Sequence, residues 1–244
     1  MSIFKKISAL LFSERIDRNQ VPREAWLEST LRRIPKGSRI LDAGAGELAY
    51  KKYCSHLDYV AQDFGQYTGT GDGKGLQTVA WNQTQLDIIC DICEMPEPDA
   101  SFDAIMCVEV FEHLPDPLSA LREFSRLLKP GGYLMITAPF CAFTHFSPYF
   151  FGTGFSSYWY EEHLSSRGFH ILDLQANGNF PAFMMQEVGR IPVMAQKYTT
   201  ITPSIVEKLA LRIVQSLLGK MYRNDRASQE FACFGFHVFA QKQM

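Results

Sequence analysis

A glycine-rich turn is the first feature in this sequence that can bind a cofactor. The run DAGAG at residues 42–46 follows an apolar segment. Glycines in such a turn let the backbone approach a ligand closely, because no Cβ intervenes. The pattern GxGxxA over residues 44–49 also fits the relaxed dinucleotide fingerprint, so the glycines alone leave the ligand open. The residues expected to contact a nucleotide cofactor here are Asp42, Gly44, Ala45 and Gly46.

Charge at this turn separates two kinds of cofactor. Asp42 lies just before the turn and Glu47 just after it. Two carboxylates at this place would repel the diphosphate of a dinucleotide, whereas they would attract ammonium and sulfonium groups. The sequence therefore favours a positively charged sulfonium donor over NADH.

Carboxylates also follow the next predicted strands. Asp63 ends the apolar segment 57–63, where a carboxylate can bind both hydroxyls of a ribose. Asp91 and Ile92 follow segment 86–90 and suit the amino group and ring face of an adenine. One strand-end aspartate is commonly a helix cap, but four such features in order indicate a ligand-binding sheet edge. The full set expected beyond the turn is Asp63, Phe64, Asp91, Ile92, Val108 and Glu109.

Apolar segments alternate with helical patterns along the chain, which predicts a doubly wound α/β sheet with helices on both faces. The strands are apolar on both faces, as a covered sheet requires. We expect strands at 38–43, 57–63, 86–90, 102–110, 133–140, 169–175 and 231–242. We expect helices directly after the glycine-rich turn, at 118–128, around 158–167 and over 181–228.

Two further motifs carry a family resemblance. The chain contains EHLPDP from Glu112 to Pro117 and LLKPGG from Leu127 to Gly132. Together with the turn, they make residues 39–140 resemble class I S-adenosylmethionine-dependent methyltransferases, in a branch with quinone-biosynthesis, natural-product and surface-glycan enzymes. The resemblance implies a Rossmann-like sheet of seven strands, mostly parallel with the last one antiparallel, and S-adenosylmethionine as cofactor. The sequence departs from the family at Leu48, where many members carry a third glycine.

The resemblance and the patterns together divide the chain into four parts. Residues 1–35 are expected to hold N-terminal helices, 36–180 the methyltransferase core with an aromatic loop at 140–160, and 231–244 its final strand. The connection 181–230 is longer than is usual in this family. It is expected to be either a lid over an acceptor or a contact between two copies in a homodimer.

A neutral hydroxyl acceptor needs a base near the methyl group. His113 and His145 are the candidates, with Glu109 and Glu112 behind them. His113 follows the fourth strand, and His145 lies in the aromatic loop. Because a lone histidine is commonly structural, both assignments stay open at this point.

The function that the sequence favours is methyl transfer from S-adenosylmethionine to a small molecule, at a sugar or natural-product hydroxyl. The alternatives are C-methylation of a quinone or lipid-like ring, and a catalytically inactive binding subunit. A net charge of −2 disfavours a nucleic-acid substrate.

Cysteines, hydropathy and the N-terminus give three further expectations. Cys90-x-x-Cys93 has no second pair at zinc-ribbon spacing, so no metal site is expected. The sequence has no run of eighteen apolar residues, so no membrane span is expected. Residues 3–11 have an apolar helical face, which is expected to pack on the core or on a second subunit, or alternatively to make a weak contact with a membrane surface. The scattered cysteines and the lack of a secretory leader pattern predict a cytoplasmic protein.

Overall fold

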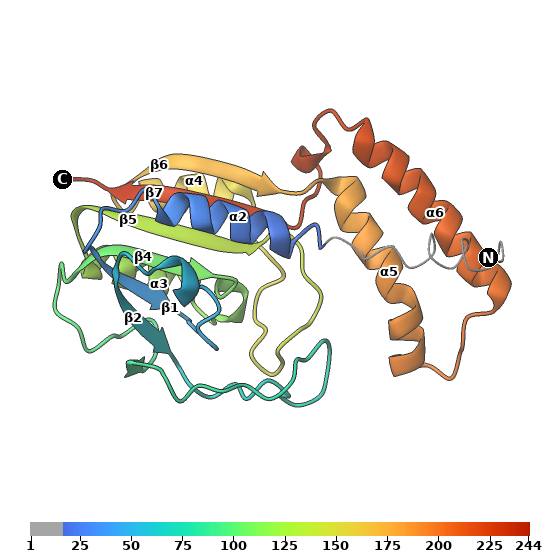
Figure 1. Cartoon of the computed structure of the whole chain (residues 1–244), viewed down its shortest axis with the longest axis horizontal. Coiled ribbons are helices and arrows are strands. Elements are labelled where there is room, and N and C mark those ends of the chain that lie inside the picture. Colours follow the sequence, from blue (N-terminus) through green and yellow to red (C-terminus); the bar gives the residue numbers. More distant parts are fainter. Residues whose placement is uncertain (1–16) are drawn as a thin grey trace.

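The structure, a computed structural model, describes residues 17–244 and has a seven-stranded sheet at its centre (Figure 1). The strand order is β3-β2-β1-β4-β5-β7-β6, and β7 runs antiparallel to both of its neighbours. The other paired strands are parallel. The strands are β1 (Arg39–Ala43), β2 (Asp58–Asp63), β3 (Ile88–Ile89), β4 (Phe102–Val108), β5 (Leu128–Pro139), β6 (Phe169–Asn177) and β7 (Gly235–Lys242). The predicted sheet, with its antiparallel last strand, is confirmed.

Helices cover both faces of this sheet, and two more extend beyond its end (Figure 1). The predicted helix over residues 3–11 lies outside the described residues. The α-helices are α2 (Gln20–Leu31), α3 (Pro117–Leu127), α4 (Ser157–Ser165), α5 (Phe180–Tyr198) and α6 (Ile205–Arg223). Short 3-10 helices are η1 (Lys51–Tyr53), η2 (Phe111–His113) and η3 (Ser228–Glu230).

Side chains of the central strands alternate between two cores. On β4, Met106 packs on the same side as Leu27 of α2, whereas Ile105 packs with Phe124 of α3 and Tyr160 of α4. This alternation follows from the two-residue period of a strand. Each fully buried large side chain contributes about 1.5–3 kcal/mol relative to an exposed one. The two cores hold the strand ends, and therefore the site, in a fixed arrangement.

Capping residues set the helix boundaries. The carboxylate of Asp116 accepts hydrogen bonds from the backbone N–H groups of Leu118 and Ser119, so α3 begins at Pro117. It ends at Leu127 because Leu128 already belongs to β5. The predicted helical stretch 181–228 is two helices, and a capping box between Ser204 and Glu207 begins the second.

The α-helix expected directly after the glycine-rich turn is wrong. Residues 47–50 form turns, and only the three-residue η1 follows before β2. Leu48 has a φ of 60°, a left-handed conformation that an α-helix of L-residues does not tolerate. The expected strand 86–90 is likewise reduced to two residues. The strand predicted over 102–110 ends at Val108, because Glu109 also has a positive φ, of 55°.

An apolar stripe on the last helix is exposed. Ile205, Leu209 and Ile213 of α6 face away from the core, and Leu218 is buried against residues of α5. Figure 1 shows α5 and α6 as a pair standing away from the sheet. Within residues 17–244, no helix combines the length and the apolar character needed to cross a bilayer.

We predict that Leu48→Gly leaves the free energy of unfolding within about 1 kcal/mol of wild type. Glycine relieves the left-handed strain of about 1–2 kcal/mol, and this offsets the entropy and the partial burial that are lost. Chemical denaturation measures the change. The matched control is Leu57→Gly, a partly buried leucine that packs on the core beneath α2 and is not left-handed. It should destabilise by about 2 kcal/mol or more. Equal losses in the two variants would contradict the prediction.

Candidate active site

A cavity of about 510 Å³ lies at the carboxyl ends of β1, β2, β3 and β4. Parallel strands bring these ends to one edge of the sheet, which is where open α/β sheets bind ligands. Six predicted cofactor residues line the cavity: Gly44, Asp63, Phe64, Asp91, Ile92 and Glu109. Phe146 of the predicted aromatic loop also lines the cavity. Tyr67 and Trp81 were not predicted, because they lie on loops without a regular pattern.

Asp63 holds the glycine-rich turn in place. Its buried carboxylate accepts hydrogen bonds from the backbone N–H groups of Gly46 at 3.0 Å and Gly65 at 2.9 Å. Gly44 has a φ of 81°, and a Cβ there would lie 2.5 Å from Cγ2 of Val110. Only glycine fits at this position, so the turn leaves its backbone open to the cavity.

Asp42 and Glu47 do not supply the negative charge of this cavity. Asp42 is 1% exposed, accepts a 2.5 Å hydrogen bond from the Tyr59 hydroxyl and is outside the cavity lining. Burial raises the pKa of the Asp42 carboxyl to about 7, although Tyr59 opposes this shift. Glu47 accepts from the backbone N–H of Asn82. The carboxylates in the lining are instead those of Asp63, Asp91 and Glu109. Four other predicted cofactor residues do not belong to the lining: Asp42, Ala45, Gly46 and Val108. Their contact with a cofactor stays a prediction.

Glu109 stands between this cavity and a second one. Its carboxylate accepts a hydrogen bond from the Thr137 hydroxyl at 2.9 Å and forms a 2.8 Å ion pair with Arg23 of α2. Burial raises the pKa of the Glu109 carboxyl, and the Arg23 guanidinium acts against that shift. The contribution of Arg23 was not predicted, because nothing in the α2 sequence indicates a partner at the end of β4.

The second cavity has a volume of about 230 Å³ and shares Glu109 and Phe146 with the first. The aromatic loop predicted at 140–160 supplies several of its walls, as expected for a segment that follows the fifth strand. Residues of α5 supply another wall. Its polar lining residues are Asn19, Gln77, Thr78, Glu109, Glu112, His145, Gln186 and Arg190. A third cavity of about 400 Å³ adjoins it through Gln186 and Arg190.

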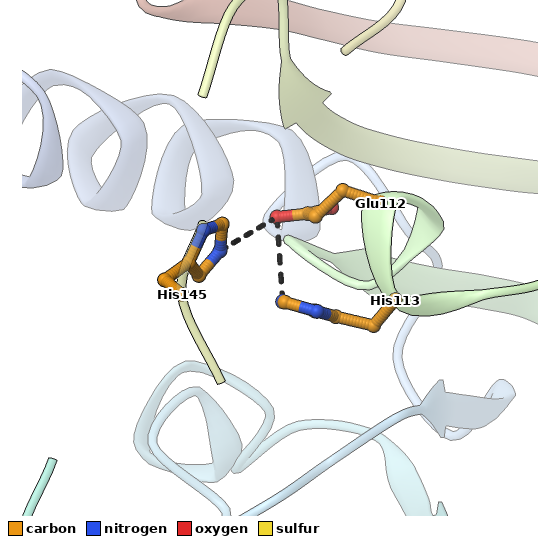
Figure 2. A group of neighbouring side chains, drawn as sticks. All are labelled: Glu112, His113 and His145. Atoms are coloured by element: carbon orange, nitrogen blue, oxygen red, sulfur yellow. Dashed lines mark ion pairs between the residues drawn. The ribbon is translucent and has the colours of Figure 1, made fainter. Parts of the chain in front are cut away.

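Both candidate histidines meet at one carboxylate, and we call Glu112, His113 and His145 the Glu112 cluster. Figure 2 shows the two rings directed at Oε1 of Glu112, which lies 3.7 Å from Nε2 of His113 and 3.6 Å from Nε2 of His145. Burial lowers the pKa of His113, and the Glu112 carboxylate only partly opposes it. Burial also acts to lower the pKa of His145, but Glu112 and the Phe143 carbonyl outweigh it and raise that pKa.

Backbone hydrogen bonds bring the aromatic loop to this cluster. The N–H groups of Phe151 and Gly152 donate to the carbonyl of Glu112 at 2.9 and 3.0 Å. Nδ1 of His113 donates to the carbonyl of Tyr149 at 2.5 Å. The sequence placed Glu112 only behind the histidines, because these contacts connect segments far apart in the chain.

Residues 41–136 match the model of a family described as a methyltransferase domain. A ubiquinone biosynthesis O-methyltransferase of Xanthomonas oryzae pv. oryzae is 32% identical over 104 residues, which are 41% of this chain and 43% of that relative. The chain thus matches less than half the length of this curated relative.

Two solved structures share the fold. A SAM-dependent methyltransferase from Archaeoglobus fulgidus superposes with a TM-score of 0.53 at 14% identity, covering 99% of this chain and 100% of that one. Phosphoethanolamine N-methyltransferase 2 of Haemonchus contortus, in complex with S-adenosyl-L-methionine, gives 0.52 at 15% identity, covering 96% and 55%. The match of residues 41–136 to a methyltransferase-domain model and the shared fold agree with the resemblance to class I S-adenosylmethionine-dependent methyltransferases.

We predict that stability falls between pH 4 and 7 through Asp42. The folded protein keeps the Asp42 proton up to a pH of about 7, whereas an unfolded chain releases it near 3.8. The folded state therefore binds more protons in this window, so its free energy of unfolding declines as the pH rises, by up to roughly 4 kcal/mol. Urea denaturation at several pH values measures this slope. Asp42→Asn should flatten it, and Asp58→Asn, at an exposed position of β2, should not. A slope unchanged in Asp42→Asn would contradict the assignment.

Proposed function

We propose that this protein transfers the methyl group of S-adenosylmethionine to a hydroxyl of a small molecule. The observation that carries the proposal is the pair of adjoining cavities that share Glu109 and Phe146. The first has the residues of a nucleotide site, and the second has imidazole and carboxylate groups able to act on a hydroxyl. Methyl transfer requires the sulfonium and its acceptor to meet in line in an enclosed space.

The cofactor is assigned to the larger cavity. The Asp63 carboxylate would bind the ribose hydroxyls, and Asp91 with Ile92 would contact the adenine. Glu109 lies toward the second cavity, where a positively charged methionine moiety is favoured over a phosphate. These retained residues also argue against an inactive binding subunit, which has no need of them.

The acceptor is assigned to the second cavity. Its mixture of aromatic and polar side chains supports a sugar or natural-product ring bearing a hydroxyl. The curated relative named for O-methylation in ubiquinone biosynthesis supports oxygen as the acceptor atom. We assign activation of the hydroxyl to His145, which lines this cavity, together with His113 beside it.

One observation favours the alternative of a quinone or lipid-like acceptor that is methylated at carbon. The third cavity continues from the second, and its lining includes Met185, Val193 and Met194 of α5. Such apolar room would hold the tail of a lipid-like molecule while its ring occupies the second cavity.

The two helices between β6 and β7, α5 and α6, are assigned different roles. Phe183, Gln186 and Arg190 of α5 line the second cavity, which supports the lid prediction for this half of the segment. The exposed apolar face of α6 is what a contact in a homodimer requires, and that contact stays a prediction. A cytoplasmic location also stays a prediction.

Calorimetry with S-adenosylhomocysteine tests the cofactor site. We expect the wild type to bind, and we expect the affinity to fall about tenfold or more in Asp63→Ala. Removal of the carboxylate would leave two ribose hydroxyls unpaired. Asp173→Ala, on β6 and outside the cavity lining, is the control and should bind as wild type. NADH should not bind. Tight NADH binding, or unchanged affinity in Asp63→Ala, would refute the cofactor assignment.

Transfer of labelled methyl groups to a panel of sugars, phenols and quinols tests the reaction. We expect His145→Ala to lower kcat by about a hundredfold, the usual worth of an activating group, with the affinity for S-adenosylhomocysteine unchanged. His163→Ala, on α4 and outside both cavity linings, is the control. Full turnover in His145→Ala would remove His145 from the reaction. Label on carbon would favour the quinone-ring alternative.

A further inference from the structure

Three electron-pair donors, Nε2 of His113, Nε2 of His145 and Oε1 of Glu112, converge in the Glu112 cluster. Nδ1 of His145 donates to the Phe143 carbonyl at 2.9 Å, and Nδ1 of His113 donates to the Tyr149 carbonyl. A neutral imidazole with its proton on Nδ1 presents a lone pair at Nε2. Both Nε2 atoms therefore direct a lone pair at the same carboxylate oxygen, Oε1 of Glu112 (Figure 2).

A cation at the centre of this cluster would balance the buried charge of Glu112. The Glu112 side chain is 1% exposed, and within the described residues neither of its oxygens has a hydrogen-bond partner. A buried, unpaired carboxylate costs several kcal/mol. The guanidinium of Arg23 is already paired with Glu109. A single proton could lie between Oε1 of Glu112 and Nε2 of only one of the two histidines. The lone pair on the other Nε2 would still face the carboxylate oxygen and be repelled by it.

We propose that Glu112, His113 and His145 bind a divalent transition-metal ion of the zinc class. One ligand atom from each residue lies within 4.8 Å of the others, and the two contacts with Oε1, at 3.6 and 3.7 Å, are close to the ligand separations around an ion bound at about 2.0–2.2 Å. Two imidazoles and one carboxylate favour zinc, manganese, iron or cobalt over the all-oxygen sites of magnesium and calcium.

The surroundings of the two histidines fit the same assignment. Metal-binding imidazoles commonly donate their second N–H to a carbonyl, which fixes the ring and its tautomer. His113 and His145 both do so, from different segments of the chain. The Cys90-x-x-Cys93 pair, where a metal was considered and not expected, has no part in this site.

What the ion would do rests on the proposed function. Glu112 and His145 line the second cavity, so an ion between them lies beside the proposed acceptor. A hydroxyl bound to the ion would release its proton to solvent more readily, because a divalent metal lowers the pKa of a bound hydroxyl. The resulting oxyanion would attack the methyl carbon, and the C–S bond would break as the O–C bond forms, leaving S-adenosylhomocysteine. In this arrangement the two imidazoles act through the ion and not as free bases.

Metal binding by the whole 244-residue chain is the test, measured without cofactor or acceptor. After treatment with a chelator, Zn²⁺ is titrated by calorimetry and the bound metal is counted by mass spectrometry. We expect one ion per chain, bound about a hundredfold more weakly in Glu112→Gln and in His145→Ala, since even second-sphere changes cost 10–100-fold. His170→Ala, an exposed histidine on β6, should bind as wild type. Thermal unfolding checks that each variant is folded, and either cluster variant alone suffices if the other does not fold.

Co²⁺ identifies the ligands. We expect visible d–d bands and no near-ultraviolet charge-transfer band from a thiolate. Such a charge-transfer band would place the ion on cysteines and overturn the proposal. Absence of Zn²⁺ binding, or equal binding in the cluster variants and the wild type, would also overturn it. If no metal binds while His145→Ala still impairs methyl transfer, the proposed function stands and this inference fails. If the ion binds at the cluster but no acceptor is methylated, the metal site stands and the proposed function fails.

Discussion

The site depends on two backbone hydrogen bonds, from the N–H groups of Phe151 and Gly152 to the carbonyl of Glu112. They fold the aromatic loop back onto η2, and this contact places His145 against the Glu112 carboxylate. The same fold closes the second cavity beside the first, so that Phe146 lines both. Without this return of the loop, the edge of the sheet would carry the larger cavity but not the enclosed second one.

Charge at the sheet edge is distributed differently from its distribution along the sequence. Asp42 belongs to the run that suggested a sulfonium donor, but it is buried against Tyr59 and its pKa is raised to about 7. The carboxylates that line the larger cavity come from the ends of β2, β3 and β4. The electrostatic preference for a cation is therefore retained, although different residues provide it. Arg23 moderates it at Glu109, the residue that separates the two cavities.

In the motifs that carried the family resemblance, some residues stabilise the fold and others lie at the cavities. In EHLPDP, the Asp116 carboxylate caps α3 and Pro117 begins it, whereas Glu112 and His113 face each other at the cavities. In LLKPGG, the chain passes directly from α3 into β5, and Gly131 takes a φ of 76° that favours glycine. A match to these motifs thus identifies the fold strongly and the acceptor hardly at all, because most of their residues shape the sheet.

The sequence by itself determined the sheet, its strand order in the chain and six residues of the larger cavity, Asp63 and Asp91 among them. These follow from local patterns, since a short continuous apolar run marks a strand covered on both faces and its last residue marks the sheet edge. It failed at Leu48, where a left-handed conformation prevents the helix that the sequence pattern predicted after the glycine-rich turn. Only the tertiary structure decided that His113 and His145 both lie against Oε1 of Glu112. It also decided that Arg23 forms an ion pair with Glu109. Such contacts depend on how irregular loops return to the sheet, and no periodic pattern encodes that path.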